Sequence, residues 1–332
     1  MGSRVAAIEY HLPDGILSNE DLEHEFPEWS SEKIENKVGI RERRIAASGE
    51  TALDLAEAAA RKLLESQSQA AVDLVMLCTQ SPDYFLPPSA CILQDRLGLP
   101  TSVGAFDFNL GCSGYVYGLA LAHGLISSGT ASEILLVMAE TYSKHIHPRD
   151  RGNRTVFGDA AAASLVTESE DDGIGRFVLG TDGSGFNRLI VTAGGMRSKC
   201  GTSDDGDADA DQDGNSADCL FMDGPEIFNF TIATVPKLIQ DTLHENQLSM
   251  DEIDYFVFHQ ANRYMLEHLR KRIRIPKEKF HLDMLRIGNT VSATIPIALA
   301  DALEKGVIKS GSRVVVAGFG VGLSWGATIL KI

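Results

Sequence analysis

The sequence predicts an α/β protein made of two related halves, each holding a sheet covered by helices. Short apolar runs alternate with amphipathic helical patterns along the chain, which is typical of strands packed under helices. The second half also repeats three apolar runs of the first half, which indicates an internal duplication. The matching pairs are 254–259 with 73–78, 313–317 with 134–138, and 326–332 with 161–168.

The expected elements follow the chain in this alternating order, and we expect the buried strands to pair in parallel. No linker rich in Pro, Gly or Ser separates the halves, so we predict one compact body with halves 1–170 and 171–332. The predicted strands are 72–79, 104–110 and 134–138, and the predicted helices are 88–97, 113–127 and 293–304.

Composition excludes several classes of protein. The 332 residues carry a formal net charge of −16, which repels nucleic acid and anionic membrane surfaces. No apolar stretch approaches the ~18 residues that span a bilayer, and the first residues lack a secretory signal pattern. The five cysteines have no regular spacing, which favours free thiols in a reducing compartment. We therefore expect a cytoplasmic protein without nucleic-acid or membrane partners and without a Cys200–Cys219 bond.

One acidic, low-complexity stretch, 201–218, breaks the alternating pattern and is expected to be an exposed loop. Asp209, Asp211 and Asp213 resemble the start of a calcium-binding loop. The twelfth position of such a loop is normally Glu, but here it is Leu220, and no helices flank the stretch. We expect no bound metal here or elsewhere, and no cofactor.

Cys112 is a candidate nucleophile because it directly follows an apolar strand and opens a helix. Unpaired N–H groups and the helix dipole favour negative charge at a helix start, so this placement predicts a lowered pKa for the thiol. Gly111 and Gly114 permit a sharp turn there. A small buried core cysteine is the commoner alternative.

His259 and Asn289 are candidate partners of the nucleophile. His259 ends an apolar strand, where α/β folds place functional side chains, and Asn289 lies in a turn before an apolar helix. Each residue could instead be structural. In a hydrolase the His deprotonates the Cys and the Asn orients the His. In a decarboxylative condensation both donate hydrogen bonds to a thioester oxygen. Papain-type residues around the nucleophile are absent.

Taken together, the motifs resemble those of the β-ketoacyl-acyl-carrier-protein synthase III family of thiolase-fold condensing enzymes, nearly from end to end. Singly several are weak, but their order and spacing are specific. They are Val-Gly-Ile-Arg-Glu-Arg at 38–43, Gly-Cys-Ser-Gly at 111–114, Asp-Arg-Gly at 150–152, Phe-Gly-Asp at 157–159, His-Gln-Ala-Asn at 259–262, Gly-Asn-Thr at 288–290 and Gly-Phe-Gly-Val-Gly at 318–322.

The resemblance implies a five-layer αβαβα thiolase-like fold, a homodimer and an acyl intermediate on Cys112. An acyl-CoA or carrier-protein thioester would load Cys112, and His259 and Asn289 would assist decarboxylation of a malonyl thioester. The oxyanion hole would use the backbone N–H groups of Cys112 and Val321, where the family has a glycine at the second position. An alternative within the fold is transfer of the acyl group to an oxygen, nitrogen or non-malonyl carbon nucleophile.

The resemblance also implies substrate contacts, with departures from the family pattern. Lys33 stands where bacterial members have the Trp that stacks on the coenzyme A adenine, and Leu86 stands where a Phe often reaches into the partner subunit's pocket. A smaller side chain there suits a longer or branched acyl group. The substrate-binding residues expected by resemblance are Lys37, Leu86, Arg151, Phe157, Leu220, Met222, Phe228 and Asn262.

A basic segment directly follows His259 in this acidic chain. Residues 263–279 hold seven Lys and Arg residues against two Glu residues. A solvated helix face is one interpretation. The other is a docking surface for an acidic acyl carrier protein, with contacts from Arg263, Arg270, Lys271 and Arg272.

Overall fold

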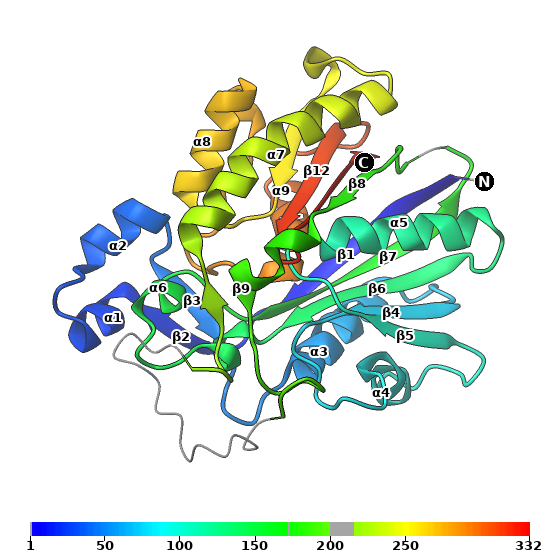
Figure 1. Ribbon diagram of the computed structural model, residues 1–332. Helices are drawn as coiled ribbons and strands as arrows, with labels where there is room; N and C mark the ends of the chain where they lie inside the picture. Colours follow the sequence, from blue (N-terminus) through cyan, green and yellow to red (C-terminus); the bar gives the residue numbers. More distant parts are fainter. Residues whose placement is uncertain (1, 172, 200–215) are drawn as a thin grey trace.

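The computed structural model describes residues 2–171, 173–199 and 216–332. Two sheets form the framework of the molecule (Figure 1). The first sheet has the order β1 (Gly2–His11), β7 (Ala160–Ser169), β6 (Glu133–Glu140), β4 (Leu74–Cys78) and β5 (Gly104–Phe108). The second has the order β11 (Tyr255–Phe258), β12 (Arg313–Gly320), β13 (Ser324–Lys331) and β8 (Val178–Thr181).

The strand pairs that the sequence matched occupy equivalent positions in the two sheets. In the first sheet β4 pairs parallel with β6, and β6 pairs antiparallel with β7. In the second, β11 pairs parallel with β12, and β12 pairs antiparallel with β13. Residues 2–169 supply the first sheet and residues 178–331 the second.

The strands predicted at 72–79, 104–110 and 134–138 pair in parallel, which confirms that expectation, but each sheet as a whole is mixed. β1 and β7 run antiparallel to their neighbours, as do β13 and β8. A parallel pair needs a long crossover connection. Residues 141–159 between β6 and β7 contain only the short 3-10 helix η1 (Tyr142–His145) and α6 (Arg151–Arg154), and three residues separate β12 from β13.

Helices fill three layers around the two sheets. α3 (Ala52–Ser66) and α4 (Ser89–Arg96) pack on the outer face of the first sheet, and α7 (Gly224–Glu245) packs on the outer face of the second beside α8 (Arg263–Ile273). Between the sheets lie α5 (Gly114–Ser127) and α9 (Thr294–Glu304), which contact strands of both. The result is the five-layer αβαβα arrangement, which confirms the predicted fold class.

Three apolar clusters hold these layers together. The largest lies between the sheets and is built from α5, α9 and the inner faces of both sheets, and the other two lie under the outer helices. Burying apolar surface contributes about 25 cal/mol per Å², so these clusters dominate stability. Within the described residues, no helix combines the length and the apolar character needed to span a membrane.

A smaller layer of short elements covers one edge of this framework (Figure 1). Capping side chains begin both of its first two helices: Ser18 accepts from the Asp21 N–H and Ser30 from the Lys33 N–H. The elements are β2 (Gly15–Ser18), α1 (Asn19–Glu25), α2 (Ser31–Val38), β3 (Glu42–Ile45), β9 (Leu189–Ile190) and β10 (Phe221–Met222).

Candidate active site

Cys112 lies where the two halves of the chain meet. It sits between β5 and α5 and is 5% exposed. β12 of the other half passes directly beside it, and both strand residues that face it are glycines. A Cβ on Gly320 would stand 2.9 Å from the Cys112 sulfur, and one on Gly318 would stand 2.6 Å from the Cys112 carbonyl oxygen. Any side chain at these positions would displace the nucleophile.

The prediction of a lowered pKa for Cys112 was wrong in direction. Burial raises the pKa of the thiol to about 12, and the buried carboxyl of Glu140 adds to the rise. Helix α5 begins only at Gly114, so the thiol is not at the first turn, and removal from water outweighs the field of the helix. Cys112 therefore carries a neutral thiol at rest.

The backbone N–H groups of Val321 and of Cys112 itself interact favourably with the Cys112 thiolate and partly offset the rise in its pKa. The turn that carries Val321 is fixed by hydroxyl groups. Ser324 Oγ donates to the Val321 carbonyl at 2.7 Å and lies 2.7 Å from Ser113 Oγ. These are the two amides expected to form the oxyanion hole, and Val321 provides its N–H as a glycine would.

His259 follows β11 and is held from two sides. Its backbone N–H donates to the Ala317 carbonyl at 2.8 Å, and its Nδ1 lies 2.7 Å from Thr294 Oγ1 at the start of α9. Burial lowers the pKa of the imidazole to about 3, so the ring is neutral at physiological pH. Both Cys112 and His259 are thus uncharged at physiological pH.

Asn289 is oriented by a strained turn. Its Oδ1 accepts from the Val291 N–H at 2.9 Å, which leaves the Nδ2 hydrogens free to donate. Val291 has a φ of 55°, which is costly for a β-branched residue and recurs at functional sites. The backbone is also tied down, since the Asn289 N–H donates to the Val156 carbonyl at 2.9 Å. The turn therefore presents Asn289 as a hydrogen-bond donor.

The three candidate catalytic residues line one small cavity of about 80 Å³. Three residues expected from the sequence, Phe157, Met222 and Asn262, line it as well. The structure adds walls that sequence reasoning missed: Val156, Leu189, Ile227, Thr231, Met265 and Phe319. Only Ile227 and Thr231 share an element, α7, so no local motif connects the set.

A neighbouring cavity of about 610 Å³ opens beside the first. Leu189 lines both, and Leu220 lines the larger one. Leu86 lines neither and is 80% exposed in the single chain, while its neighbour Phe85 does line the larger cavity. Residues 200–215, which include Cys200 and the calcium-like motif, lie outside the described residues, and Cys219 is a free thiol.

Phe228 was wrongly predicted to line the acyl pocket. Its ring packs 5.5 Å from that of Tyr264 and 5.4 Å from that of His268, in the contact between α7 and α8. Successive helical residues differ by about 100°, so Ile227 and Thr231, four apart, face the cavity while Phe228 turns toward α8.

Comparison with known proteins identifies the family. The family models for the main and C-terminal parts of 3-oxoacyl-[acyl-carrier-protein] synthase III match residues 106–183 and 243–332. The chain is 37% identical over 327 residues to the β-ketoacyl-[acyl-carrier-protein] synthase III of Clostridium perfringens, covering 97% of each. It is 35% identical over 330 residues to that of Fusobacterium nucleatum subsp. nucleatum, covering 98% of each. The chain belongs to the synthase III family.

The structural comparison agrees with this assignment. A solved 3-oxoacyl-(acyl-carrier-protein) synthase III matches with a TM-score of 0.96, at 48% identity and over 100% of both chains. The resemblance inferred from the motifs is therefore confirmed, and the protein is an acyl-transferring condensing enzyme.

In this synthase III member, aromatic rings accompany the two cations expected to bind coenzyme A. Lys37 Nζ lies 5.4 Å from the centre of the Trp29 ring, and the Arg151 guanidinium lies 5.5 Å from that of Phe26. Arg151 also pairs with Glu28 at 2.5 Å. Sequence reasoning noted the missing aromatic ring at position 33 but overlooked these two rings a few residues earlier.

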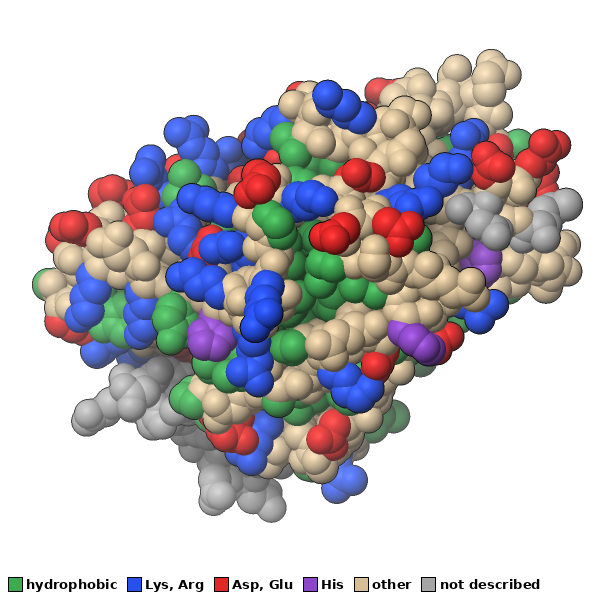
Figure 2. Space-filling view, turned by 90° about the horizontal axis from the view of Figure 1, so that it is seen from above, with side chains coloured by type: hydrophobic (Ala, Val, Ile, Leu, Met, Phe, Trp, Pro, Cys, Tyr) green, Lys and Arg blue, Asp and Glu red, His purple; other side chains and the backbone are tan. Residues whose placement is uncertain are grey.

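The expected docking residues on α8 differ in their availability. Arg263, Lys271 and Arg272 are exposed. The Arg270 side chain is only 15% exposed, pairs with Glu267 at 2.8 Å and donates to the Ile275 carbonyl at 3.0 Å. It therefore closes the C-terminal end of α8 and is poorly placed to bind a partner. Figure 2 shows Lys and Arg gathered toward the end of the molecule that carries α2 and α8.

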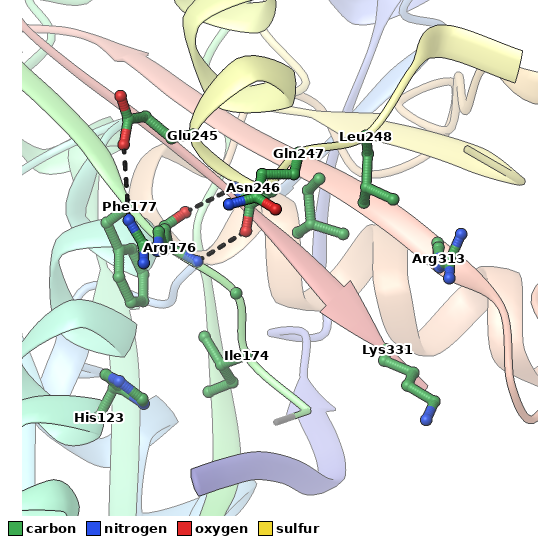
Figure 3. A pocket seen from close by; sticks show the side chains of 12 residues that line it. His123, Ile174, Arg176, Phe177, Glu245, Asn246, Gln247, Leu248, Arg313 and Lys331 are labelled. Atoms are coloured by element: carbon green, nitrogen blue, oxygen red, sulfur yellow. Dashed lines mark hydrogen bonds and ion pairs between the residues drawn. The ribbon is translucent and has the colours of Figure 1, made fainter. Parts of the chain in front are cut away.

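A separate groove of about 450 Å³ lies away from Cys112 (Figure 3). It shares no residue with the catalytic cavity. Asn246 at the end of α7 accepts from the Arg176 N–H at 2.7 Å and donates to the Arg176 carbonyl at 3.0 Å. The cations Arg176 and Arg313 have acidic partners, Glu245 at 4.0 Å and Glu252 at 3.4 Å. These contacts fasten α7 to the segment before β8.

Glu140 is a buried acidic residue near the site, and sequence reasoning missed it. Its place at the end of a long apolar run could have indicated a buried carboxyl. It is fully buried and accepts from the Gln80 N–H at 3.1 Å, Ser81 Oγ at 3.1 Å and Ser292 Oγ at 3.3 Å. It thus joins the segment before Phe85 to the turn after Asn289. Burial raises the pKa of its carboxyl to about 8.

Glu140→Gln should change how stability depends on pH. The pKa rises from 4.5 to about 8 on folding, so between these values the folded state keeps a proton that the unfolded state has lost. Wild-type stability should therefore fall, relative to the variant, by on the order of a few kcal/mol as pH rises from 4.5 to 8. Urea unfolding across that range measures this difference. The exposed control variant Glu65→Gln should follow the wild type. If the free energy of unfolding of Glu140→Gln depends on pH as that of the wild type does, Glu140 does not have the raised pKa.

Proposed function

We propose that the protein joins an acyl group held on Cys112 to a malonyl thioester, with loss of carbon dioxide, to give a β-ketoacyl thioester. One observation carries this proposal above the others. The Val291 N–H occupies Asn289 Oδ1, so the Asn289 amide enters the Cys112 cavity as a donor beside the neutral His259. Two uncharged donors suit the oxygen of a thioester enolate, which gains negative charge as carbon dioxide leaves.

The acyl group is loaded first. The Cys112 sulfur attacks the carbonyl of an acyl-CoA or acyl-carrier thioester, and the bond from that carbonyl to the carrier sulfur breaks. The thiol proton leaves with the carrier thiolate. The oxyanion of the tetrahedral intermediate lies toward the Val321 and Cys112 N–H groups, which interact favourably with the Cys112 thiolate.

Condensation then consumes the malonyl thioester. Its carbon–carboxylate bond breaks, carbon dioxide leaves, and the electron pair remains as an enolate held by His259 and Asn289. The enolate carbon bonds to the acyl carbonyl, and the carbonyl–sulfur bond to Cys112 breaks. The Cys112 thiolate that leaves takes one proton from water, which restores the thiol, and no redox partner is needed.

The hydroxyl group of Thr294 contacts the histidine and bears on which ring nitrogen carries the proton. Its single hydroxyl proton can go to His259 Nδ1 at 2.7 Å or to the Val291 carbonyl at 2.9 Å. When it goes to Nδ1, the ring proton must be on Nε2, which can then donate to a thioester oxygen. Condensation therefore requires the Nε2 tautomer, in which the Thr294 hydroxyl proton points to Nδ1 and not to the Val291 carbonyl.

The hydrolase alternative finds no support in these contacts. A cysteine hydrolase uses its asparagine to orient the histidine. Here Thr294 contacts His259 Nδ1, and the Asn289 oxygen is occupied by Val291. Transfer to an oxygen, nitrogen or non-malonyl carbon nucleophile would use the same acyl-Cys112, and only dependence on malonyl thioester distinguishes it from condensation.

We further propose that the working form is a cytoplasmic homodimer that accepts coenzyme A and carrier-protein thioesters. Cys78, Cys91, Cys112 and Cys219 are all free thiols, which suits a reducing compartment. Three consecutive large apolar residues, Tyr84, Phe85 and Leu86, are 61%, 80% and 80% exposed. Apolar surface of this kind is typical of a protein interface.

The dimer predicts a definite mass. Light scattering at micromolar concentration should give about twice the 35.9 kDa chain mass. The double variant Phe85→Glu/Leu86→Glu should weaken association, because it places two charges in the interface. Val307→Glu, which changes an exposed apolar side chain of another segment, should remain dimeric. A wild-type monomer would remove the proposed role of Leu86 in the partner's pocket.

If a carrier protein docks on α8, charge reversal there should weaken activity on carrier-bound substrates only. Lys271→Glu/Arg272→Glu should raise KM for a carrier-bound substrate by roughly tenfold at low salt, since docking of an acidic partner is electrostatic. Turnover of a small soluble thioester should hardly change. The control Lys309→Glu/Lys331→Glu makes the same change in net charge elsewhere. Equal losses on both substrates, or equal effects of both double variants, would exclude docking on α8.

A further inference from the structure

A second cluster of polar side chains lies at a different place in the second half. His281 follows Phe280, which forms a bridge with Phe256 of β11, Asp283 lies two residues on, and Asp301 projects from α9. One ligand atom from each side chain lies within 4.8 Å of the other two. None of the three lines the cavity at Cys112.

His281 points an unsatisfied nitrogen into this cluster. The residue is 5% exposed, and its Nε2 makes no hydrogen bond, although Asp301 Oδ2 lies 3.5 Å away. Its Nδ1 lies 3.4 Å from the Tyr255 hydroxyl. When Nδ1 carries the ring proton, the Nε2 lone pair faces a carboxylate oxygen, an arrangement that a cation between the two would stabilise. A buried polar atom without a partner is otherwise costly.

One lysine pairs with both carboxylates. Lys305 Nζ lies 2.6 Å from Asp301 Oδ1 and 3.2 Å from Asp283 Oδ2. The lysine side chain is 58% exposed, against 14% for Asp301 and 27% for Asp283. The Lys305 side chain therefore reaches the carboxylates from the solvent side, and it can rotate back into solvent without disturbing the core. A single ammonium also leaves one net negative charge on the two adjacent carboxylates. Burial, and after it the nearby Asp301 carboxyl, raises the pKa of Asp283.

We propose that His281, Asp283 and Asp301 bind one divalent metal ion, which replaces the Lys305 ammonium. One imidazole and two carboxylates are a donor set for Zn²⁺, Co²⁺ or Mn²⁺. Metal–ligand bonds of about 2.0–2.2 Å place adjacent donor atoms roughly 3–3.5 Å apart. The His281 and Asp301 atoms are already 3.5 Å apart, so Asp283 must close in as the lysine leaves.

Such an ion would join two segments that contact the surroundings of His259. The Asp283 N–H donates to Gln260 Oε1 at 2.9 Å, next to His259. Asp301 lies on α9, whose first residue is Thr294. The ion would therefore stiffen the support of the site without touching the substrate, and the proposal does not rest on the condensation chemistry.

Titration of the full chain with Co²⁺, followed by calorimetry and visible absorption, tests the site. We expect one ion per chain. His281→Gln and Asp301→Asn should each weaken binding at least tenfold, since each removes a ligand. The control His244→Ala changes an exposed histidine 3.7 Å from Glu245 and should bind Co²⁺ as the wild type does. Absent binding in the wild type, or equal binding in the ligand variants, would overturn the proposal.

Lys305→Met provides a test that does not depend on removing a ligand. Because it deletes a competing charge about 3 Å from both carboxylates, it should tighten Co²⁺ binding by roughly tenfold or more. Circular dichroism confirms that each variant is folded. Unchanged or weaker binding in a folded Lys305→Met protein would show that Lys305 does not occupy a metal position.

Discussion

Cys112→Ala should abolish covalent acylation and condensation together. The Cys112 sulfur interacts with the Val321 and Cys112 N–H groups and lies in the one cavity that also contains His259 and Asn289. No other cysteine among the described residues lines that cavity. Incubation with an accepted acyl-CoA should add one acyl mass to the wild-type chain and none to the variant.

The matched control for this result is Cys78→Ala. Cys78 is also buried, and its sulfur donates to the Leu110 carbonyl at 2.9 Å, but it lies outside the cavity. This variant should still acquire the acyl group. Full acylation of the Cys112→Ala protein would show that a different residue is the nucleophile.

His259→Ala and Asn289→Ala should separate the two half-reactions. Each removes one donor to the enolate, and losing such a donor costs on the order of 10²-fold or more in rate. Acylation of Cys112 should fall much less, because the Val321 and Cys112 amides remain. Carbon dioxide release from a malonyl thioester and acyl mass on the protein, measured in the same samples, give the two rates.

Asn289→Asp sharpens this test. Aspartate keeps the acceptor for the Val291 N–H but replaces the donor amide with a carboxylate, which repels an enolate. It should lose at least as much decarboxylation as Asn289→Ala. Wild-type decarboxylation in this variant would contradict a donor role for Asn289.

The sequence predicted features that repeat or that occur within short motifs. The apolar runs at 73–78 and 254–259 became equivalent strands, and residues 112, 259 and 289 came together although they are far apart in the chain. Hydrophobic periodicity indicates which residues face a core, and short motifs indicate which residues take part in the chemistry.

Features that depend on three-dimensional burial could not be predicted in this way. The layers packed around Cys112 remove it from water, and this burial raises its pKa more than the nearby helix start lowers it. Phe228 follows Ile227 directly in α7, and the rotation of one helical residue turns its ring away from the cavity. Arg270 is bound by Glu267, whereas Arg272 on the same helix is exposed. β7 runs antiparallel to β6, because the connection between them contains only the short helices η1 and α6 and no long crossover helix.

A single-turnover experiment tests the central claim most directly. Acyl-Cys112 protein, freed of excess acyl-CoA, is mixed either with malonyl thioester or with buffer alone, and the acyl mass on the chain is followed with time. The account predicts that malonyl thioester removes the acyl group while releasing one carbon dioxide and one β-ketoacyl thioester per chain, and that buffer leaves it in place. Loss of the acyl group in buffer at the same rate, with free acid as product, would show a hydrolase and contradict the account.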